Sequence, residues 1–117
     1  GMKSDVWSLA KYMMMHMNYG TYGNVKIISE PSARLMQSKQ TTTDVEKIFY
    51  GYALRSMDKS WVPDANLKGH TGSAYGMTST MTFNPCEKYG FVTLCNGYKC
   101  ARPSVDFDKM LYYHFIY

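Results

Sequence analysis

The sequence has 117 residues, of which 45% are hydrophobic and 19% charged, and it carries a formal net charge of +4. These values describe one globular domain and exclude a disordered chain. The basic residues are scattered, whereas nucleic-acid binding requires a basic patch or stripe, so we expect no nucleic-acid partner. No signal-peptide pattern and no apolar run of about 18 residues occurs, so we expect no membrane segment. Gly1 before Met2 is typical of tag cleavage, and we take 2–117 as a single domain.

The cysteines and histidines indicate neither a disulfide framework nor a metal site. Cys86, Cys95 and Cys100 are odd in number and include no Cys-x-x-Cys pair. His16 and His114 lie in separate predicted helices, and neither has a Cys or a carboxylate at ligand spacing. We therefore predict no metal and no cofactor.

The first predicted helix runs from Ser4 to about Asn18. Ser4 is a suitable N-cap, and Gly20 follows the end of the helix. One face of this helix is predicted to pack inward, because its apolar residues recur at helical spacing. These residues are Val6, Leu9, Ala10, Met13, Met14 and Met17.

A Gly-rich turn over 19–23 and a short apolar connector over 25–28 follow. A second short helix is predicted over 30–38, with Ser29 as its N-cap and Pro31 in its first turn. Its predicted inward residues are Ala33, Leu35 and Met36.

The middle of the chain predicts one strand between two loops. Residues 40–46 are polar and Thr-rich, and 58–68 contain a proline that argues against regular structure. Between them, 49–55 is typical of a strand.

The stretch from Gly69 to Ser79 holds the densest cluster of Gly, Thr, Ser and His in the chain. The following residues, 77–83, alternate between threonines and a mostly apolar set, which is the period of a strand. Residues 84–88 are typical of a turn, and 89–96 predict a further strand. The unit is therefore a short polar strand, a Gly-rich bend and an antiparallel hairpin.

A loop over 98–103 and a last helix complete the chain. Ser104 is the predicted N-cap, with Asp106 and Asp108 near the start of the helix. The predicted inner face consists of Phe107, Met110, Leu111, His114 and Phe115.

The unit that begins at Gly69 resembles the last sequence motif of the serine β-lactamase and penicillin-binding protein superfamily, whose members carry Lys-Thr-Gly or His-Thr-Gly on a strand beside the active site. The matching residues are His70-Thr71-Gly72, and the run from 69 to 97 is similar to the family's next strands, including their Asn-Pro turn. Leu9-Ala10-Lys11-Tyr12-Met13 and Ile27-Ile28-Ser29-Glu30-Pro31 add to the resemblance, with the Glu and Pro inverted. The resemblance covers nearly the whole chain and corresponds to the C-terminal portion of a complete family member.

The resemblance implies acyl transfer through a serine nucleophile, and it assigns substrate-binding roles to four residues here. His70 and Thr71 would contact the substrate carboxylate or its surroundings, and Gly72 would keep the strand free of a side chain beside the pocket. The backbone N–H of Ser73 would supply one oxyanion-hole donor. For His70 a second interpretation stays open, because a lone histidine on a strand is usually a hydrogen-bonded or solvated residue.

The family's remaining motifs occur literally but at the wrong places. Ser8-Leu9-Ala10-Lys11 and Ser56-Met57-Asp58-Lys59 fit the nucleophile pattern Ser-x-x-Lys, and Tyr22-Gly23-Asn24 fits Tyr-x-Asn. Ser8, however, lies in the segment that is similar to a different helix of the family. It also precedes the tyrosine motif at Tyr22 by a single turn region, whereas the family separates these two motifs by many tens of residues. We therefore interpret Ser8 and Lys11 as chance matches and predict no catalytic residue in this chain.

We predict an α+β fold, a partial β-lactamase-like fold with three to four antiparallel strands. The last helix is expected on one face of the sheet and the leading helices on the other face or at the edge. A complete member has a further helical region and more strands, so a sheet face and an edge would lie exposed. We expect a homodimer or the missing N-terminal portion to cover them.

These observations predict a truncated or fragmentary β-lactamase-like serine hydrolase that keeps the His-Thr-Gly strand, lacks the nucleophile and is inactive alone. Two alternatives stay open: a non-catalytic module that binds a partner, a peptide or a small molecule, and a hydrolase completed by another chain. The family divides among β-lactams, peptides and esters, so the sequence names no substrate. The family is commonly exported, but this chain shows no export signal, and its localisation stays open.

Overall fold

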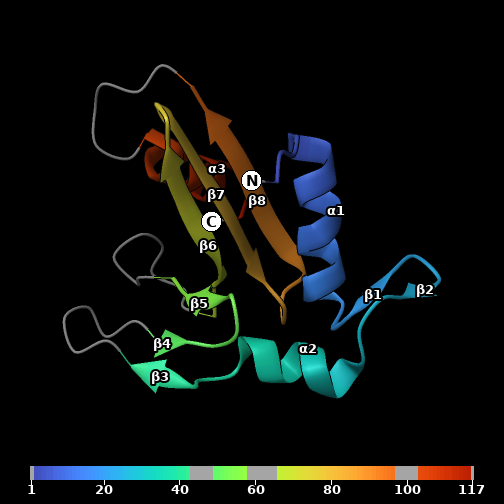
Figure 1. Ribbon diagram of the computed structural model, residues 1–117. Coiled ribbons are helices and arrows are strands. Elements are labelled where there is room, and N and C mark those ends of the chain that lie inside the picture. Colours follow the sequence, from blue (N-terminus) through green and yellow to red (C-terminus); the bar gives the residue numbers. More distant parts are fainter. Residues whose placement is uncertain (1, 43–48, 58–65, 97–102, 117) are drawn as a thin grey trace.

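The computed structural model describes residues 2–42, 49–57, 66–96 and 103–116, and it places helices on both faces of one antiparallel sheet (Figure 1). The α+β class is therefore confirmed. The sheet has six strands in the order β3-β4-β5-β6-β7-β8. Our estimate of three to four was too low because three strands contain only two residues each: β3 (Thr41–Thr42), β4 (Phe49–Tyr50) and β5 (Arg55–Ser56).

The centre of the sheet is the predicted polar strand and hairpin. It consists of β6 (Lys68–Ala74), β7 (Met77–Asn84) and β8 (Tyr89–Cys95). Only Tyr75 and Gly76 join β6 to β7, and both have positive φ, at 52° and 77°, which is typical of a two-residue type I′ turn. In the next turn the Asn84 side-chain oxygen accepts hydrogen bonds from the backbone N–H groups of Cys86 (2.9 Å) and Glu87 (3.0 Å).

Helix α1 (Val6–Met17) begins two residues later than predicted. Its N-cap is Asp5 and not Ser4, because the extended backbone of Asp5 lets its carboxylate accept a hydrogen bond from the Ser8 backbone N–H at 2.9 Å. Gly20, with a φ of +101°, follows the helix as expected.

The face of α1 that packs inward differs in part from the prediction. Val6 is 44% exposed, whereas Met15 and His16, which the apolar pattern left out, are buried. Met13 and Met17 do join the core as predicted, with Leu9 and Met14 packed against it. The members of this core cluster are Met13, Met17, Leu54, Met81 and Phe83.

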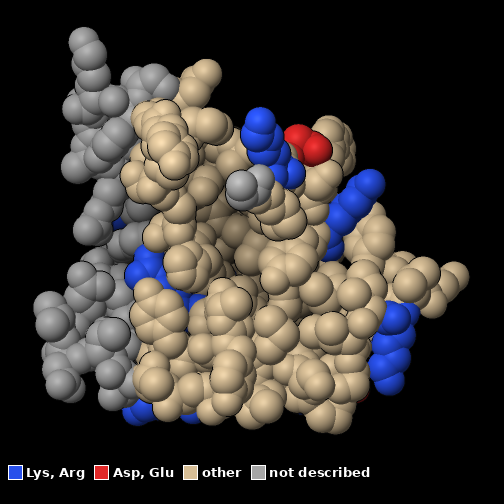
Figure 2. Space-filling view, in the orientation of Figure 1, with Lys and Arg blue, Asp and Glu red and all other residues tan. Residues whose placement is uncertain are grey.

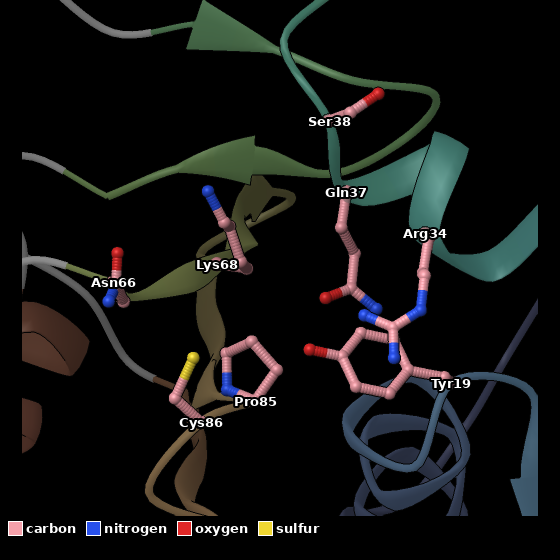
Figure 3. A pocket seen from close by; sticks show the side chains of 8 residues that line it. All are labelled: Tyr19, Arg34, Gln37, Ser38, Asn66, Lys68, Pro85 and Cys86. Atoms are coloured by element: carbon pink, nitrogen blue, oxygen red, sulfur yellow. The ribbon is translucent and has the colours of Figure 1, made fainter.

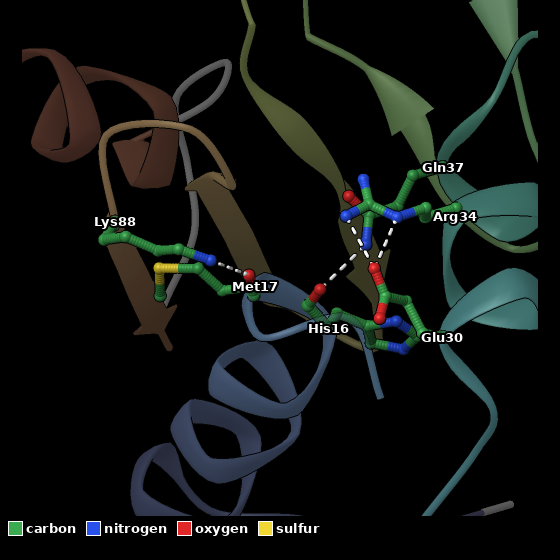
Figure 4. A network of polar contacts seen from close by, with 6 residues as sticks. All are labelled: His16, Met17, Glu30, Arg34, Gln37 and Lys88. Atoms are coloured by element: carbon green, nitrogen blue, oxygen red, sulfur yellow. Dashed lines mark hydrogen bonds and ion pairs between the residues drawn. The ribbon is translucent and has the colours of Figure 1, made fainter. Parts of the chain in front are cut away.

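Helix α2 (Glu30–Gln37) starts at the predicted N-cap, Ser29, whose hydroxyl accepts a hydrogen bond from the Ser32 backbone N–H at 3.3 Å. Ala33 is buried as expected. Leu35 is not, since it is 52% exposed, and Gln37 is buried instead. Gln37 is buried because α2 packs against the end of α1, where the Gln37 amide donates a 2.7 Å hydrogen bond to the His16 carbonyl oxygen (Figure 4).

Two further hairpins lie beside the main elements. β1 (Thr21–Tyr22) and β2 (Val25–Lys26) form a separate two-stranded sheet around the Gly-rich turn. The predicted single strand over 49–55 is wrong, because β4 and β5 pair with each other around a turn. That turn rests on the end of α2, where the Tyr52 backbone N–H donates to the Met36 carbonyl oxygen at 3.0 Å.

Helix α3 (Pro103–Phe115) covers the face of the sheet opposite α1, as predicted. Its predicted inner face is wrong: Phe107, Met110, His114 and Phe115 are exposed, and Leu111 is half-buried. Asp108 and Tyr112 are the buried residues. The sheet presents threonine hydroxyls beneath α3, and these pair with the Asp108 carboxylate rather than with an apolar side chain.

Some predictions fall outside the described residues. These are residues 43–46, 58–65 and 98–102 of the three predicted loops, together with the side chain of Ser104. Within the described part of the chain, no helix combines the length and the apolar character needed to span a bilayer.

Candidate functional site

The four predicted substrate-binding residues lie on β6, which has an open edge at this point. Along its other edge β6 pairs with β7 over its whole length, for example His70 with Met81 and Gly72 with Ser79. β5 pairs only with the first two residues of β6, Lys68 and Gly69. Within the described residues, 70–74 therefore have no strand on the β5 side, and alternate backbone N–H and C=O groups there face outward.

The motif side chains do not all point the same way. Successive residues of a strand alternate between the two sheet faces, so His70 and Gly72 lie on the face of Met81 and Ser79. Thr71 and Ser73 lie on the opposite face, which α3 covers further along the sheet. The four residues share the strand edge, and only their backbone groups form one continuous row.

His70 is exposed and interacts locally. Its Nδ1 lies 2.6 Å from the Thr71 carbonyl oxygen, and its ring centroid is 6.2 Å from that of Tyr50 in an edge-on arrangement. This geometry is compatible with the second interpretation, a hydrogen-bonded and solvated histidine. Contact between His70 and a substrate stays a prediction.

A cation beside the motif is a feature that the sequence did not reveal. The Arg55 guanidinium donates a 3.0 Å hydrogen bond to the Thr71 hydroxyl, and Arg55 is paired with Gly69 across the sheet. A guanidinium is a favourable partner for a carboxylate. Arg55 lies in the segment predicted as a single strand, and only the β4–β5 turn places it next to β6.

The surroundings of Gly72 and Ser73 are compatible with the roles that the resemblance implies, and these roles stay predictions. A Cβ added at Gly72 would lie 2.6 Å from the Ser79 hydroxyl oxygen, so glycine keeps this face of the strand open. Ser73 is exposed, and its backbone lies on the open part of β6.

Ser8 and Lys11 lie away from the motif strand. In Figure 1, α1 lies on the β8 side of the sheet, with β7 between it and β6. The Ser8 hydroxyl donates a 2.9 Å hydrogen bond to the Asp5 carboxylate, and the Ser8 hydrogen bonds hold the pKa of Asp5 below its usual range. Ser8 thus serves the N-terminal turn of α1, while Lys11 is exposed on the same helix.

The other literal motifs are also separated from β6 or occupied. Tyr22-Gly23-Asn24 lies in the β1–β2 hairpin, at a corner of the molecule beyond α1 (Figure 1). The hydroxyl of Ser56 accepts a 3.1 Å hydrogen bond from the Phe49 backbone N–H, and Lys59 lies outside the described residues.

A metal cluster or a basic surface in the part of the chain that the structure describes would mark another kind of site. Among the described residues, no three His, Cys, Asp or Glu side chains come together as metal ligands. On the face shown in Figure 2, Lys and Arg side chains are spread out separately and form no stripe. The absence of a cofactor and of a nucleic-acid partner stays a prediction.

Comparison with known proteins gives one informative relationship. No family model matches the sequence, and no curated protein matches it at the significance required. A solved structure, the octameric penicillin-binding protein homologue from Pyrococcus abyssi, is similar with a TM-score of 0.70 and 26% sequence identity. The similarity covers 92% of this chain but only 24% of that one. This chain therefore has the fold of part of a penicillin-binding protein homologue, as the His-Thr-Gly strand and its hairpin predicted.

Proposed function

We propose that this chain is the substrate-side portion of a β-lactamase-like serine hydrolase and does not acylate by itself. The observation that carries the proposal is the open edge of β6 at 70–74, which contains the residues of the His-Thr-Gly motif. An extended substrate can add to such an edge through backbone hydrogen bonds, as a further strand would.

Each motif residue then has a distinct task. The backbone N–H of Ser73 polarises the reacting carbonyl group as one oxyanion-hole donor. Arg55, held at Thr71, attracts a substrate carboxylate. Gly72 leaves the strand narrow on the face of Ser79, and His70 lines the same face.

The nucleophile in this proposal comes from residues other than Ser8. A serine nucleophile needs a base within hydrogen-bond reach and an approach to the oxyanion donors. Ser8 is bonded to the Asp5 carboxylate at 2.9 Å, in a helix that packs on β7 and β8. Without another nucleophile, the motif strand binds substrate but forms no covalent intermediate.

Intact mass spectrometry after incubation with a fluorophosphonate, and separately with a reactive penicillin, tests the catalytic part. We expect no stoichiometric adduct on the folded chain. One adduct that maps to Ser8 and disappears in a Ser8→Ala variant would overturn the proposal. A Ser32→Ala variant, which changes an exposed hydroxyl at the start of α2, is the matched control.

Amide chemical shifts during titration with the same penicillin test the binding part. We expect saturable shifts along 70–74 that weaken several-fold in Thr71→Val, because Arg55 loses its hydrogen bond to the Thr71 hydroxyl beside the strand. His70→Ala is compared with His114→Ala, which changes an exposed histidine on α3. Shifts confined to other parts of the chain would contradict the assignment of β6.

Self-association is the second part of the proposal. β8 is the last strand of the described sheet and β6 is open over 70–74, so two edges can accept a strand from another chain. The similar penicillin-binding protein homologue from Pyrococcus abyssi is octameric. We expect light scattering to give a dimer or larger species, and a single monomer at high concentration would contradict this. The same two strand edges also suit the alternative in which a different chain binds here and completes the hydrolase.

A further inference from the structure

A separate pocket lies where α2, the start of β6 and the β7–β8 turn meet (Figure 3). Its cavity volume is about 220 Å³. Gln37 and Arg34 line it from α2, Lys68 lines it from β6, and Tyr19 and Pro85 add apolar surface. None of these residues belongs to the 70–74 edge.

Lys68 lines this pocket and carries a positive charge. Its side chain is half-buried, its ammonium lies 4.3 Å from the Phe49 ring centroid, and burial lowers its pKa. Within the described residues, no carboxylate lies at ion-pair distance from it. A partly buried cation in this condition is stabilised by an anion that enters the pocket.

Gln37 brings a hydrogen-bond acceptor. The residue is only 7% exposed, and its side-chain nitrogen is committed to the His16 carbonyl oxygen. Its side-chain oxygen, Oε1, has no hydrogen-bond partner in the described structure. In Figure 3 this oxygen points toward the side of the pocket formed by Lys68 and Pro85. A buried acceptor without a donor is costly, so an N–H or O–H group arriving there is favoured.

The other cations nearby are already engaged. The Arg34 guanidinium forms a 2.7 Å ion pair with Glu30 and stacks 3.8 Å from the Tyr19 ring centroid. The Lys88 ammonium donates to the Met17 carbonyl oxygen at 2.6 Å (Figure 4). These positive groups disfavour a ligand ammonium, so the donor that reaches Gln37 should be neutral.

We propose that this pocket binds a small hydroxycarboxylate, with its acid group paired to Lys68 and its hydroxyl donating to Gln37 Oε1. The volume lies below the roughly 300–1,000 Å³ of sites for drug-sized ligands, which favours a small molecule. Pro85 offers apolar surface to a substituent of the ligand, whereas the Tyr19 ring is already stacked against the Arg34 guanidinium. This binding site is independent of the proposed hydrolase function.

Mandelate and two analogues test the proposal on the unaltered protein. Mandelate carries both required groups, phenylacetate lacks the hydroxyl, and mandelamide lacks the negative charge. In a nitrogen–proton correlation titration we expect mandelate to give saturable shifts at Gln37 and Lys68. We expect each analogue to bind about tenfold more weakly, since each loses one of the two hydrogen-bonded contacts. Equal binding of all three, or no saturable shift by about 10 mM mandelate, would overturn the proposal.

A charge-removing variant gives a second test. Lys68→Met keeps an unbranched side chain against Phe49, and we expect it to lose about tenfold in mandelate affinity. Lys26→Met makes the same change on the exposed strand β2, and it should bind as the unaltered protein does. Unchanged affinity in a folded Lys68→Met would overturn the proposal. Should that variant fail to fold, the three-ligand comparison decides the question.

Discussion

The two faces of β7 hold their helices by different means. On the α1 side, Met81 and Phe83 belong to an apolar cluster. On the α3 side, the hydroxyls of Thr80 and Thr82 donate hydrogen bonds to the Asp108 carboxylate at 2.7 and 3.3 Å. One strand therefore supports a helix through side-chain packing on one face and another helix through a buried carboxylate on the other.

This difference predicts different responses to pH. Apolar packing does not titrate, whereas a carboxylate in a buried place does. Burial raises the pKa of Asp108 to about 6, against the lowering effect of the threonine hydrogen bonds. Stability on the α3 side should thus depend on pH around the titration of one residue, and the four predictions below test the contrast.

The largest effect is expected for Phe83→Ala. Phe83 has no exposed surface and lies within the α1 cluster, so its removal loses transfer free energy and leaves a cavity. We expect a loss of about 3–5 kcal/mol in the free energy of unfolding, measured by urea denaturation. Phe115→Ala, at a position that is 67% exposed, should cost far less. Similar losses in both variants would remove the basis of the comparison.

Asp108→Asn addresses the α3 side. Because the pKa of Asp108 rises from 3.8 to about 6 on folding, the folded state binds its proton more tightly. This contribution to stability is fully present below pH 3.8 and is lost as the pH rises through about 6. For the full pKa shift from 3.8 to about 6, this loss is about 3 kcal/mol of the free energy of unfolding.

Asparagine has a similar shape and does not ionise, so the variant should lack the loss of stability that Asp108 causes between pH 3.8 and about 6, and it should be more stable than the unaltered protein at pH 8. Urea unfolding at a series of pH values measures the slope. Identical slopes for the two proteins would show that Asp108 does not titrate in this range.

Gly90→Ala tests how closely α1 approaches the sheet. A Cβ at Gly90 would lie 2.7 Å from both the Met13 sulfur and the Thr82 carbonyl oxygen. We expect a loss of about 1–3 kcal/mol, measured by thermal or urea unfolding, because the helix must shift. Repeating the substitution in a Met13→Ala background should reduce this loss. A full loss in both backgrounds would place the strain on the strand alone.

His16→Phe gives the smallest predicted effect and the opposite pH dependence. Both ring nitrogens of His16 lack hydrogen-bond partners within the described structure, and burial lowers the pKa of this residue from its ordinary value of 6.5. The contribution of neutral His16 to the free energy of unfolding is therefore fully present above pH 6.5. It falls as the pH drops below 6.5, by at most about 1.4 kcal/mol per pH unit. Phenylalanine should remove this acid-side slope in urea unfolding below pH 6.5, and an unchanged slope would contradict the assignment.

Local elements were the most predictable part of the fold. The alternation over 77–83 and the turn chemistry of Asn84 depend on neighbouring residues, and both agree with the structure. The same holds for the Ser29 cap and Pro31 at the start of α2. The N-cap of α1 shows the limit, since Ser4 and Asp5 are both suitable and the backbone geometry selected Asp5.

The sequence predicted the strand that carries the candidate site, but it did not predict which groups surround that strand. The sequence placed His70, Thr71, Gly72 and Ser73 on one strand, and the structure agrees. The open edge depends on how far β5 extends, and the contact with Arg55 depends on a turn that the sequence pattern did not reveal. The pocket that contains Gln37 and Lys68 joins four segments that are separated in the sequence, so no local pattern could reveal it.

By itself the sequence determined the α+β class, the central hairpin, the helix positions and the resemblance to penicillin-binding proteins, because periodicity, caps and turns are properties of short segments. Only the tertiary structure decided which helix faces are buried. Asp108 and His16 lie inside while Phe107 and Val6 lie outside, since burial depends on what the opposite surface offers. A threonine-lined sheet face accepts a carboxylate, and an apolar repeat within a single helix carries no information about that face.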